Sequence, residues 1–419
     1  MENDLGKRYD FKESEPRIYS LWEQSGYFSP DAAPEEAVPY VILLPPPNIT
    51  GSLHMGHALN ASLSDVLIRY HRMRGRKTVW FPGIDHAGIA TQNVVERQLK
   101  KEGKTRWDLG REAFIERVWQ WKEQYGSIIL EQFKRLGVSC DWSRLRFTMD
   151  KAYADEVKKA FIHYHQRGWI YRGTRVINWC PRCRTSLSDL EVEHEEAQET
   201  LWYISYPLKE KEGTITVATV RPETMLGDAA VAVHPDDTRY KDLVGLHAIL
   251  PIVGREIPIL ADSAIEKDFG TGAVKVTPAH DILDAEIGER HHLPLYQVIG
   301  EDGKMTKEAG ADYQGLSVKD AREKVLARLK ELGVLTKEET YTHNLAVCSR
   351  CHHILEPIPS KQWFLKMEEL ARAALDAVDR KQVRILPENF AKPYRDWLEH
   401  IRDWCISRQI WWGHRLPVY

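Results

Sequence analysis

The 419-residue sequence lacks an excess of charge of either sign, because 58 Lys and Arg stand against 61 Asp and Glu. This balance excludes a uniformly basic nucleic-acid binder and leaves only local basic stretches, residues 69–77 and 97–106, to meet a polyanion. No run approaches the roughly 18 apolar residues of a membrane span. The polar start, residues 1–4, has no apolar core of a signal peptide. We therefore expect a cytoplasmic protein with no membrane association.

Cysteine is scarce, and four of the six cysteines form two Cys-x-x-Cys pairs. The pairs are Cys180 with Cys183 and Cys348 with Cys351. In a large chain this spacing indicates metal or redox chemistry rather than a disulfide framework. Four thiolates in two such turns suit a tetrahedral structural Zn²⁺ site, while a redox pair of thioredoxin type would need a βαβ context that we do not find.

Three histidines close to the second cysteine pair leave the zinc ligand set open. They are His343, His352 and His353. Each could replace a cysteine as ligand or hydrogen-bond to one, because imidazoles near a metal commonly do either.

Length and hydrophobic pattern predict an α/β protein of two or three domains. Residues 40–44 and 78–81 have the pattern of short buried strands, and helical patterns follow each of them, over residues 52–70 and 91–101. Strands that alternate with helices predict a Rossmann-like parallel sheet, where ligands bind beyond the carboxyl ends of the strands. Further helical patterns cover residues 10–28, 111–136, 150–166 and 318–332.

A second, strand-rich domain is predicted inside the first. Residues 201–279 are dense in Val, Ile and Thr with frequent Gly and Pro, and the cysteine pairs lie near the entry and exit of this segment. The predicted division is residues 1–37 (N-terminal helix and linker), 38–175 (first part of the Rossmann-like domain), 176–190 with 343–356 (zinc-knuckle module), 191–342 (inserted domain) and 357–419 (return to the first domain).

The segment of residues 45–57, PPPNITGSLHMGH, is the most informative for chemistry. Glycines and histidines at the opening of a helix after a buried strand can hold a triphosphate against free backbone N–H groups. We expect His54 and His57, three residues apart, to share a helix face and donate hydrogen bonds to phosphate oxygens. The alternative is a pair of surface histidines on an ordinary helix.

The HMGH tetrad resembles the HIGH signature of class I aminoacyl-tRNA synthetases. Residues 83–92 (GIDHAGIATQ) and residues 402–414 (RDWCISRQIWWGH) resemble the valine-type members, and the match extends over essentially the whole chain. The resemblance implies that His54, Gly56 and His57 bind ATP, which acts with Mg²⁺. It also implies that Pro46 and Asn48 border the amino-acid pocket and that Asp85 meets the substrate ammonium group. Asp85 could instead be a turn or cap residue, and the two roles can coexist.

Two segments of the inserted domain, residues 219–224 (TVRPET) and 275–284 (KVTPAHDILD), resemble the conserved stretches of the family's editing domain. Valine enzymes are themselves the known example of an apolar pocket that rejects threonine weakly, so a second site hydrolyses the error. The resemblance implies that Asp281 holds the ammonium group of the misattached threonine. Six further residues would shape that pocket: Thr219, Arg221, Thr224, Lys275, Thr277 and Asp284. The alternative is ordinary strand threonines with a solvated charged rim.

The resemblance therefore implies a valine–tRNA ligase that activates valine with ATP, transfers it to tRNA-Val and hydrolyses threonyl-tRNA-Val. We expect His54, His57, Lys275 and Asp281 to be its catalytic residues, Zn²⁺ to be structural and the protein to be a monomer. No Lys-Met-Ser-Lys-Ser loop occurs, so we expect an N-terminal portion of the enzyme. Two alternatives stay open: this chain alone acts only as an aminoacyl-tRNA deacylase, or only as a tRNA-binding module.

Overall fold

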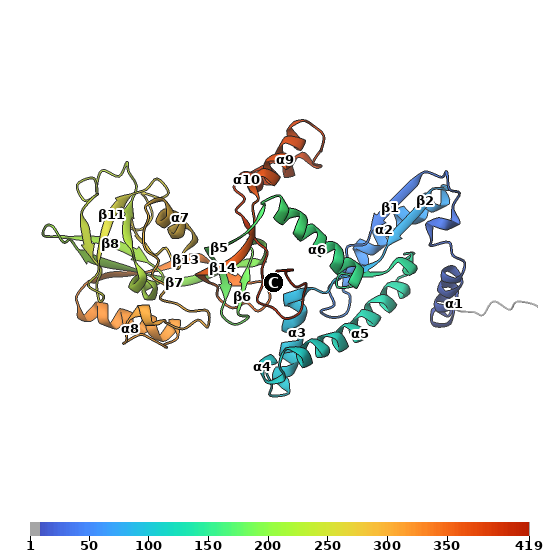
Figure 1. Cartoon of the computed structure of the whole chain (residues 1–419), viewed down its shortest axis with the longest axis horizontal. Helices are drawn as coiled ribbons and strands as arrows, with labels where there is room; N and C mark the ends of the chain where they lie inside the picture. The colour runs from blue at the N-terminus through green and yellow to red at the C-terminus, as the bar shows by residue number, and fades with distance from the viewer. Residues whose placement is uncertain (1–8, 419) are drawn as a thin grey trace, which may run out of the picture. The chain divides into compact units, whose positions relative to one another are not determined.

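The computed structural model describes residues 9–418. Residues 1–4, from which the sequence analysis argued against a signal peptide, lie outside the described residues. The chain divides into two compact units (Figure 1). Unit 1 comprises the chain up to His163 and again from Ile410, and unit 2 runs from Tyr164 to Gln409. No helix among residues 9–418 has the length and apolar character needed to cross a bilayer.

Unit 1 alternates short strands with helices. Its elements are α1 (Phe11–Gln24), η1 (Pro30–Ala32), β1 (Pro39–Leu43), α2 (Met55–Met73), β2 (Lys77–Phe81), β3 (Gly83–Ile84), α3 (Gly88–Lys101), α4 (Arg106–Leu109), α5 (Arg111–Arg135), η2 (Trp142–Arg144), β4 (Arg146–Phe147) and α6 (Lys151–Gln166). The two strands and the helical patterns predicted from the sequence for this region are all present.

The strands of unit 1 pair in parallel, which confirms the predicted parallel α/β arrangement. Strand β1 pairs with β2, with Tyr40 opposite Thr78, and β3 pairs with β4. Proline ends both β1 and β2 because it offers no N–H to a neighbouring strand. The core beneath them contains Trp80, Ile68 and Phe114, all fully buried.

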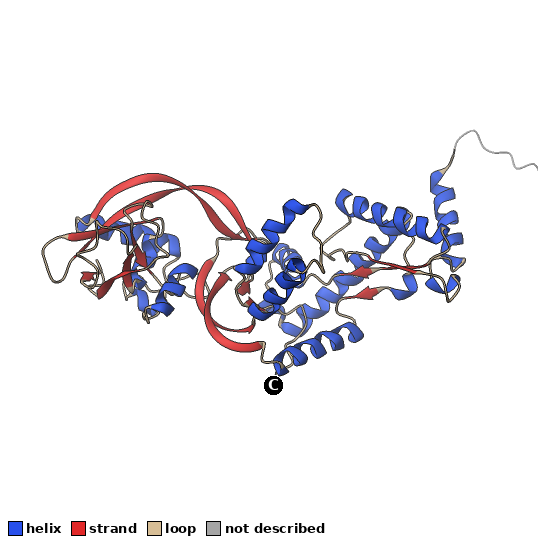
Figure 2. Ribbon diagram, turned by 90° about the horizontal axis from the view of Figure 1, so that it is seen from above, coloured by secondary structure: helices blue, strands red, loops and turns tan. Residues whose placement is uncertain are grey.

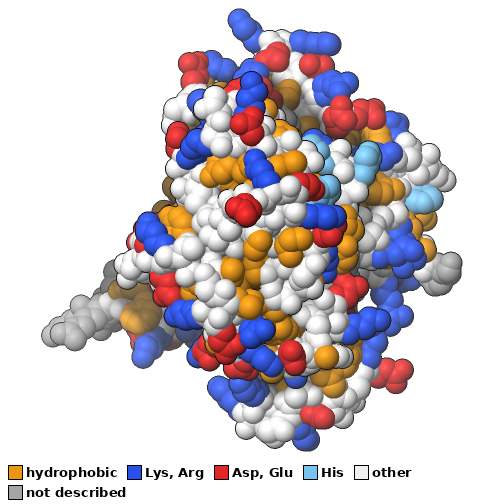
Figure 3. Space-filling view, turned by 90° about the vertical axis from the view of Figure 1, so that its left-hand side faces the viewer, with side chains coloured by type: hydrophobic (Ala, Val, Ile, Leu, Met, Phe, Trp, Pro, Cys, Tyr) orange, Lys and Arg blue, Asp and Glu red, His pale blue; other side chains and the backbone are white. Residues whose placement is uncertain are grey.

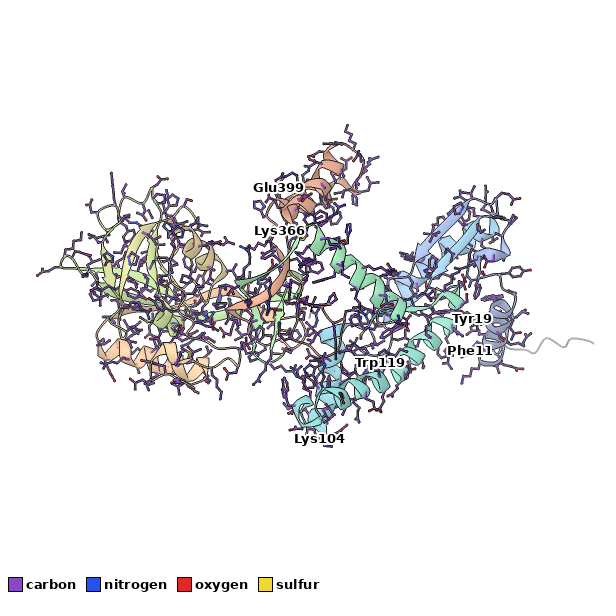
Figure 4. The ribbon with its side chains drawn as sticks, in the orientation of Figure 1. Phe11, Tyr19, Lys104, Trp119, Lys366 and Glu399 are labelled. Atoms are coloured by element: carbon purple, nitrogen blue, oxygen red, sulfur yellow. The ribbon has the colours of Figure 1, made fainter. Side chains whose placement is uncertain are left out.

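Helix α1 carries Tyr19, labelled in Figure 4, and this side chain contacts the rest of unit 1. Asp10 caps the helix by accepting a hydrogen bond from the backbone N–H of Lys12 at 2.9 Å. The Tyr19 hydroxyl donates to the carbonyl of Val138 at 2.7 Å and accepts from Nε1 of Trp142 at 2.7 Å. Burial raises the pKa of Tyr19 well above its usual value, so the hydroxyl remains a donor.

Unit 2 is rich in strands. Its elements after α6 are β5 (Ile170–Cys180), β6 (Thr185–Leu187), η3 (Asp189–Glu191), β7 (Val192–Pro207), β8 (Thr214–Thr219), η4 (Pro222–Gly227), β9 (Ala230–Val233), β10 (His247–Ile249), β11 (Glu256–Ala261), β12 (Ala273–Val276), α7 (Ile282–Arg290), η5 (Lys307–Ala309), α8 (Val318–Glu331), β13 (Leu335–Cys348), β14 (Glu356–Leu365), α9 (Glu368–Asp379), η6 (Glu388–Phe390), α10 (Ala391–Glu399) and β15 (Trp404–Cys405).

Two sheets form the strand-rich part of unit 2. One has the order β10-β11-β9-β12 and the other β13-β7-β8. The long antiparallel pair of β7 and β13 is visible as extended curved strands in Figure 2. Both sheets share one core with α8, which buries Ala321, Val325 and Leu329 at the helical spacing of four residues. Acidic, basic and apolar side chains are interspersed on the face shown in Figure 3.

A third sheet of unit 2, with the order β15-β14-β5-β6, carries both ends of the inserted segment. Residues 170–175, which the sequence assigned to the Rossmann-like domain, lie in β5 and pair with β14. Residues 357–409 also belong to unit 2, and the chain rejoins unit 1 only from Ile410. Strand pairing brings these segments together although about 180 residues separate them, which hydrophobic patterning cannot predict.

Candidate functional site

The loops after β1 and β3 meet in unit 1. Asn48 and Asp85 form an isolated parallel bridge, in which the N–H of Asp85 donates to the carbonyl of Pro47 at 2.9 Å. A Cβ placed on Gly83 would lie 3.3 Å from Cβ of Pro46, so glycine allows this close approach. The structure therefore brings together Pro46, Asn48 and Asp85, the three residues predicted to bind the amino acid.

One oxygen of the Asp85 carboxylate holds the surrounding loop. Oδ1 accepts hydrogen bonds from the N–H of Ala87 at 3.1 Å and the hydroxyl of Thr148 at 3.0 Å, and lies 3.3 Å from Nδ1 of His86. Burial acts to raise the pKa of Asp85, but the hydrogen bonds from His86, Ala87 and Thr148 outweigh it and hold the pKa below its usual value. Asp85 is thus an ionised carboxylate that also forms the turn expected as the alternative.

Thr148 contacts Asp85 and His86, and the sequence analysis did not single it out. Its Oγ1 accepts from the N–H of His86 at 2.8 Å while its hydroxyl donates to Asp85. Thr148 directly follows β4, and the parallel pairing of β4 with β3 places it beside Asp85. No local motif marks it, so sequence reasoning had no signal to find it.

The two histidines of the HMGH tetrad contact each other at the start of α2. His54 is the N-cap in an extended conformation, and its Nδ1 accepts from the N–H of Gly56 at 3.1 Å. The N–H of His54 in turn donates to Nδ1 of His57 at 3.2 Å, and the ring centroids are 4.0 Å apart. The predicted shared helix face is wrong, because His54 precedes the helix and caps it.

This capping arrangement determines where the histidine protons lie. Each Nδ1 accepts a backbone hydrogen bond, so the hydrogen-bond network assigns the remaining ring hydrogen of each neutral imidazole to Nε2. Burial, followed by the nearby His54, lowers the pKa of His57. A Cβ on Gly56 would lie 3.0 Å from the His54 ring, so any larger residue here would press on the capping ring. The pair can therefore present two Nε2–H donors to an anion.

A buried polar cluster in unit 2 joins η4 to β12. Nζ of Lys275 donates to Oγ1 of Thr224 at 2.9 Å, to Oγ1 of Thr277 at 2.5 Å and to Oδ1 of Asp228 at 3.2 Å. All four side chains are buried. The structure thus brings together three residues predicted for the editing pocket and adds Asp228, which the sequence analysis missed.

The start of α7 carries the two acidic residues predicted for the same pocket. Asp281 is exposed and caps the helix by accepting from the N–H groups of Leu283 at 2.8 Å and Asp284 at 3.0 Å. Asp284 is buried, and its Oδ2 accepts from the N–H of Thr277 at 2.8 Å. Burial, and then the charge of Asp281, raise the pKa of Asp284 to about 7. Asp284 is therefore only partly ionised near neutral pH.

The raised pKa of Asp284 makes a prediction about stability. Its folded value of about 7 lies above the ordinary carboxyl value, so the stabilising contribution of the protonated form is present below about pH 4 and is lost as the pH rises through 7. We expect the free energy of unfolding to fall between about pH 5 and pH 8 in the wild type, and to fall less in Asp284→Asn. Urea unfolding at the two pH values measures this, with the exposed Asp312→Asn variant as control. An equal pH dependence in all three chains would contradict it.

Arg221 is held by two buried glutamates that the sequence analysis did not identify. The guanidinium lies 3.3 Å from Oε1 of Glu223 and also pairs with Glu356 on β14. Arg322 of α8 contacts the same Glu223 at 2.8 Å. Thr219 lies at the end of β8, where its Oγ1 accepts from the N–H of Arg221 at 3.0 Å. Long-range ion pairs of this kind leave no trace in local sequence.

The four cysteines of the two pairs come together where β5 and β13 end. Their Sγ atoms all lie within 4.8 Å of one another, with two of the separations at 3.5 Å. Four sulfurs at about 2.3 Å from one Zn²⁺ in a tetrahedron would be separated by about 3.8 Å, so the donor set fits this ion. Among the described residues the group contains cysteines alone. His343 and His352 instead pair with Glu199 and Glu195.

Known proteins are similar to this chain over nearly its whole length. The family model for class I tRNA synthetases (I, L, M and V) matches residues 17–419. The chain belongs to this family. Valine–tRNA ligases of Carboxydothermus hydrogenoformans and Dehalococcoides mccartyi are 54% and 53% identical to it over 98% and 99% of this chain, and over 46% and 47% of their own length. The chain thus spans about half the length of these curated relatives.

A solved LeuRS–tRNA–LeuAMS complex from Agrobacterium radiobacter is 18% identical to this class I synthetase chain, with a TM-score of 0.41 over 84% of this chain and 52% of the other. The sequence resemblance to valine-type members is confirmed by the relatives. The residues predicted to bind ATP and the amino acid lie in unit 1, whereas the residues predicted for the editing pocket and the four cysteines form separate groups in unit 2.

Proposed function

We propose that this chain contributes part of the synthetic site and the whole hydrolytic site of a valine–tRNA ligase. The proposal rests chiefly on one observation: the relatives that match nearly the whole chain at about half identity are valine–tRNA ligases. The meeting of Asn48 with Asp85 near the HMGH tetrad agrees with this function, because ligands of parallel α/β sheets bind beyond the strand ends.

The synthetic reaction has two steps. A carboxylate oxygen of valine attacks the α-phosphorus of ATP and pyrophosphate leaves; a hydroxyl of the terminal adenosine of tRNA-Val then attacks the activated carbonyl and AMP leaves. Mg²⁺ bound with ATP would neutralise phosphate charge. Oδ1 of Asp85 takes the three contacts described above, and we assign Oδ2 to the valine ammonium group, beside Pro46 and Asn48. The Nε2–H groups of His54 and His57, with Gly56 allowing close approach, donate to phosphate oxygens as charge develops there.

The hydrolytic reaction removes threonine from tRNA-Val. Water attacks the ester carbonyl, the ester C–O bond breaks, and the tRNA leaves with its hydroxyl restored. We assign Asp281 to the ammonium group of the threonyl ester because it is an exposed carboxylate that caps α7 beside Asp284, which in turn contacts Thr277 of the Lys275 cluster. Lys275 is the cation of that cluster, and the remaining pocket residues are Thr219, Arg221, Thr224, Thr277 and Asp284.

We propose that residues 191–342 form the inserted editing domain and that residues 176–190 with 343–356 form the zinc-knuckle module, as predicted from the sequence. We propose that Cys180, Cys183, Cys348 and Cys351 hold a structural Zn²⁺, which would tie the entry and exit of the inserted editing domain together. The close approach of the four Sγ atoms supports this assignment. We also propose that the protein acts as a monomer on tRNA-Val in the cytoplasm.

An exposed apolar face in unit 1 indicates whether the chain can activate valine by itself. Among the described residues β1 has a strand partner at one edge only. Val41 and Leu43 are 54% and 70% exposed, and α2 exposes Leu59, Leu63 and Val66 by more than 60% each. Large apolar side chains exposed to this extent on one strand and one helix indicate an interaction site. We therefore propose that valine activation requires further strands and helices packed on this face.

The proposed function is tested by two assays on the 419-residue chain. We expect it to hydrolyse threonyl-tRNA-Val and spare valyl-tRNA-Val, and to exchange pyrophosphate with valine far more slowly than a relative of full length. The variant Asp281→Asn keeps the helix cap but removes the charge. Loss of one partner of a desolvated charge pair costs roughly 2–5 kcal/mol, so we expect hydrolysis to fall on the order of 100-fold.

Each other outcome contradicts a stated part of the proposal. Pyrophosphate exchange at the full-length rate would contradict the need for further strands on the exposed apolar face. Hydrolysis that Asp281→Asn leaves unchanged would contradict the role of Asp281. Binding of tRNA with a steep salt dependence and no hydrolysis would identify a tRNA-binding module instead.

A further inference from the structure

Asp228 lies between η4 and β9 and is fully buried. Its Oδ1 accepts from Oγ1 of Thr277 at 2.6 Å and from Nζ of Lys275 at 3.2 Å. Its Oδ2 accepts from the hydroxyl of Tyr206 at 2.7 Å, and Tyr206 is also fully buried. Three side chains thus converge on one carboxylate: Tyr206 from β7, Lys275 from β12 and Thr277 directly after β12.

The donors and acceptors of this cluster allow one arrangement of hydrogens. The Thr277 hydroxyl gives its only hydrogen to Asp228, so it can only accept from Lys275. The Thr224 hydroxyl gives its hydrogen to the carbonyl of Arg221 at 2.9 Å, so it also accepts from Lys275. The three hydrogens of the Lys275 ammonium group therefore point at Thr224, Thr277 and Asp228. Removing Asp228 would release the Thr277 hydroxyl to rotate.

The positive charge of the buried Lys275 also requires Asp228 as its counter-ion. The Lys275 side chain is 8% exposed and Asp228 is its ion-pair partner, and a buried cation without a counter-ion is costly. Burial raises the pKa of Asp228, and Lys275, Thr277 and Tyr206 oppose that rise. Asp284 faces the same cluster but is held by the N–H of Thr277.

We propose that Asp228, held in place by Tyr206, is the positioning residue of the hydrolytic site: it fixes the ammonium group of Lys275 and orients the hydroxyl of Thr277. This inference rests on the function proposed above, because Lys275 and Thr277 serve a reaction only if that site hydrolyses aminoacyl-tRNA. Asp228 acts through these two side chains, since both of its carboxylate oxygens are taken up by Lys275, Thr277 and Tyr206.

The kinetic test compares three variants in hydrolysis of threonyl-tRNA-Val. We expect Asp228→Asn to lower kcat on the order of 100-fold, as misplacement of a reacting group by about 1 Å does, while KM changes less than about 3-fold. Tyr206→Phe keeps the carboxylate and removes one hydrogen bond, so we expect a smaller loss, about 3- to 10-fold. The matched control is Asp262→Asn, a buried carboxylate of the same unit that pairs with Arg290; we expect its kcat to be unchanged.

A second measurement reads the position of Lys275 without hydrolysis. Each chain is acylated with a limiting amount of acetic anhydride at about pH 8, and mass spectrometry gives the reactivity of Lys275 relative to the exposed Lys319. We expect Asp228→Asn to increase this ratio at least about 10-fold, because the ammonium group loses its counter-ion. Asp262→Asn should leave the ratio at the wild-type value.

The outcomes separate this inference from the proposed function. If the wild type hydrolyses threonyl-tRNA-Val and Asp228→Asn does so with the same kcat, the positioning role is wrong. If the wild type hydrolyses nothing, the proposed function fails, and the labelling alone decides whether Asp228 holds Lys275. Unchanged labelling in a folded Asp228→Asn chain would overturn the inference in either case, and Tyr206→Phe serves if that chain does not fold.

Discussion

Replacement of Cys180 by serine is expected to remove zinc from the chain and to unfold the ends of β5 and β13. The Sγ of Cys180 lies 3.5 Å from that of Cys351, and all four cysteine sulfurs lie within 4.8 Å of one another. A structural zinc site contributes an apparent binding free energy of about 10 kcal/mol or more to folding. Native mass spectrometry measures the metal, and hydrogen exchange of the two strand ends measures the unfolding.

The control for this experiment is Cys140→Ser, because Cys140 is a buried cysteine of unit 1 outside the cluster. We expect that variant to retain about one zinc per chain, since one closed tetrahedral site holds one ion. A wild-type chain that contains no metal, together with a Cys180→Ser chain of unchanged stability, would show that the cluster is not a zinc site.

Replacement of Glu223 by alanine is expected to destabilise unit 2 by about 3–5 kcal/mol, the usual cost of removing one partner from a buried ion pair. Glu223 is fully buried and contacts both Arg221 and Arg322. Burial acts to raise the pKa of Glu223, but the two arginines hold the pKa below its usual value. Urea unfolding measures the change, and hydrogen exchange of peptides from β7 and α8 assigns it to unit 2.

The matched control is Glu323→Ala, an exposed glutamate on the same helix as Arg322. Exposed substitutions of this kind change stability by about 0.5 kcal/mol or less. If Glu223→Ala unfolds at the same urea concentration as Glu323→Ala, the ion pairs of Glu223 contribute nothing to folding. A loss confined to unit 1 peptides would contradict the assignment of this network to unit 2.

The histidine pair shows which features of the site the HMGH tetrad predicts without a structure. The tetrad predicted that His54 and His57 lie together at the start of a helix after a strand, and the structure places them there. The pattern could not say that His54 precedes the helix, because capping depends on the backbone angles of a single residue. That detail decides which ring nitrogen carries the hydrogen.

The polar cluster in unit 2 contains residues that no sequence motif predicted. The sequence pointed to Lys275 and Thr277 through resemblance, and Glu223 lies in the segment of residues 219–224 singled out in the same way. Asp228 and Glu356 carry no local signal. Each of these carboxylates acts on a residue from another strand or helix. Charge pairing across the fold depends on tertiary contacts, which periodicity and composition do not encode.

The amino-acid sequence by itself determined the parallel strands of unit 1, the strand-rich insertion, the two cysteine pairs and the family, because each leaves a local pattern of hydrophobic period, spacing or motif. Only the tertiary structure decided which carboxylates neutralise the buried cations, how Thr148 supports Asp85, and which segments pair in the sheet of β14 and β5. Those contacts join residues far apart in the chain, and their energies depend on burial and distance, which exist only once the chain has folded.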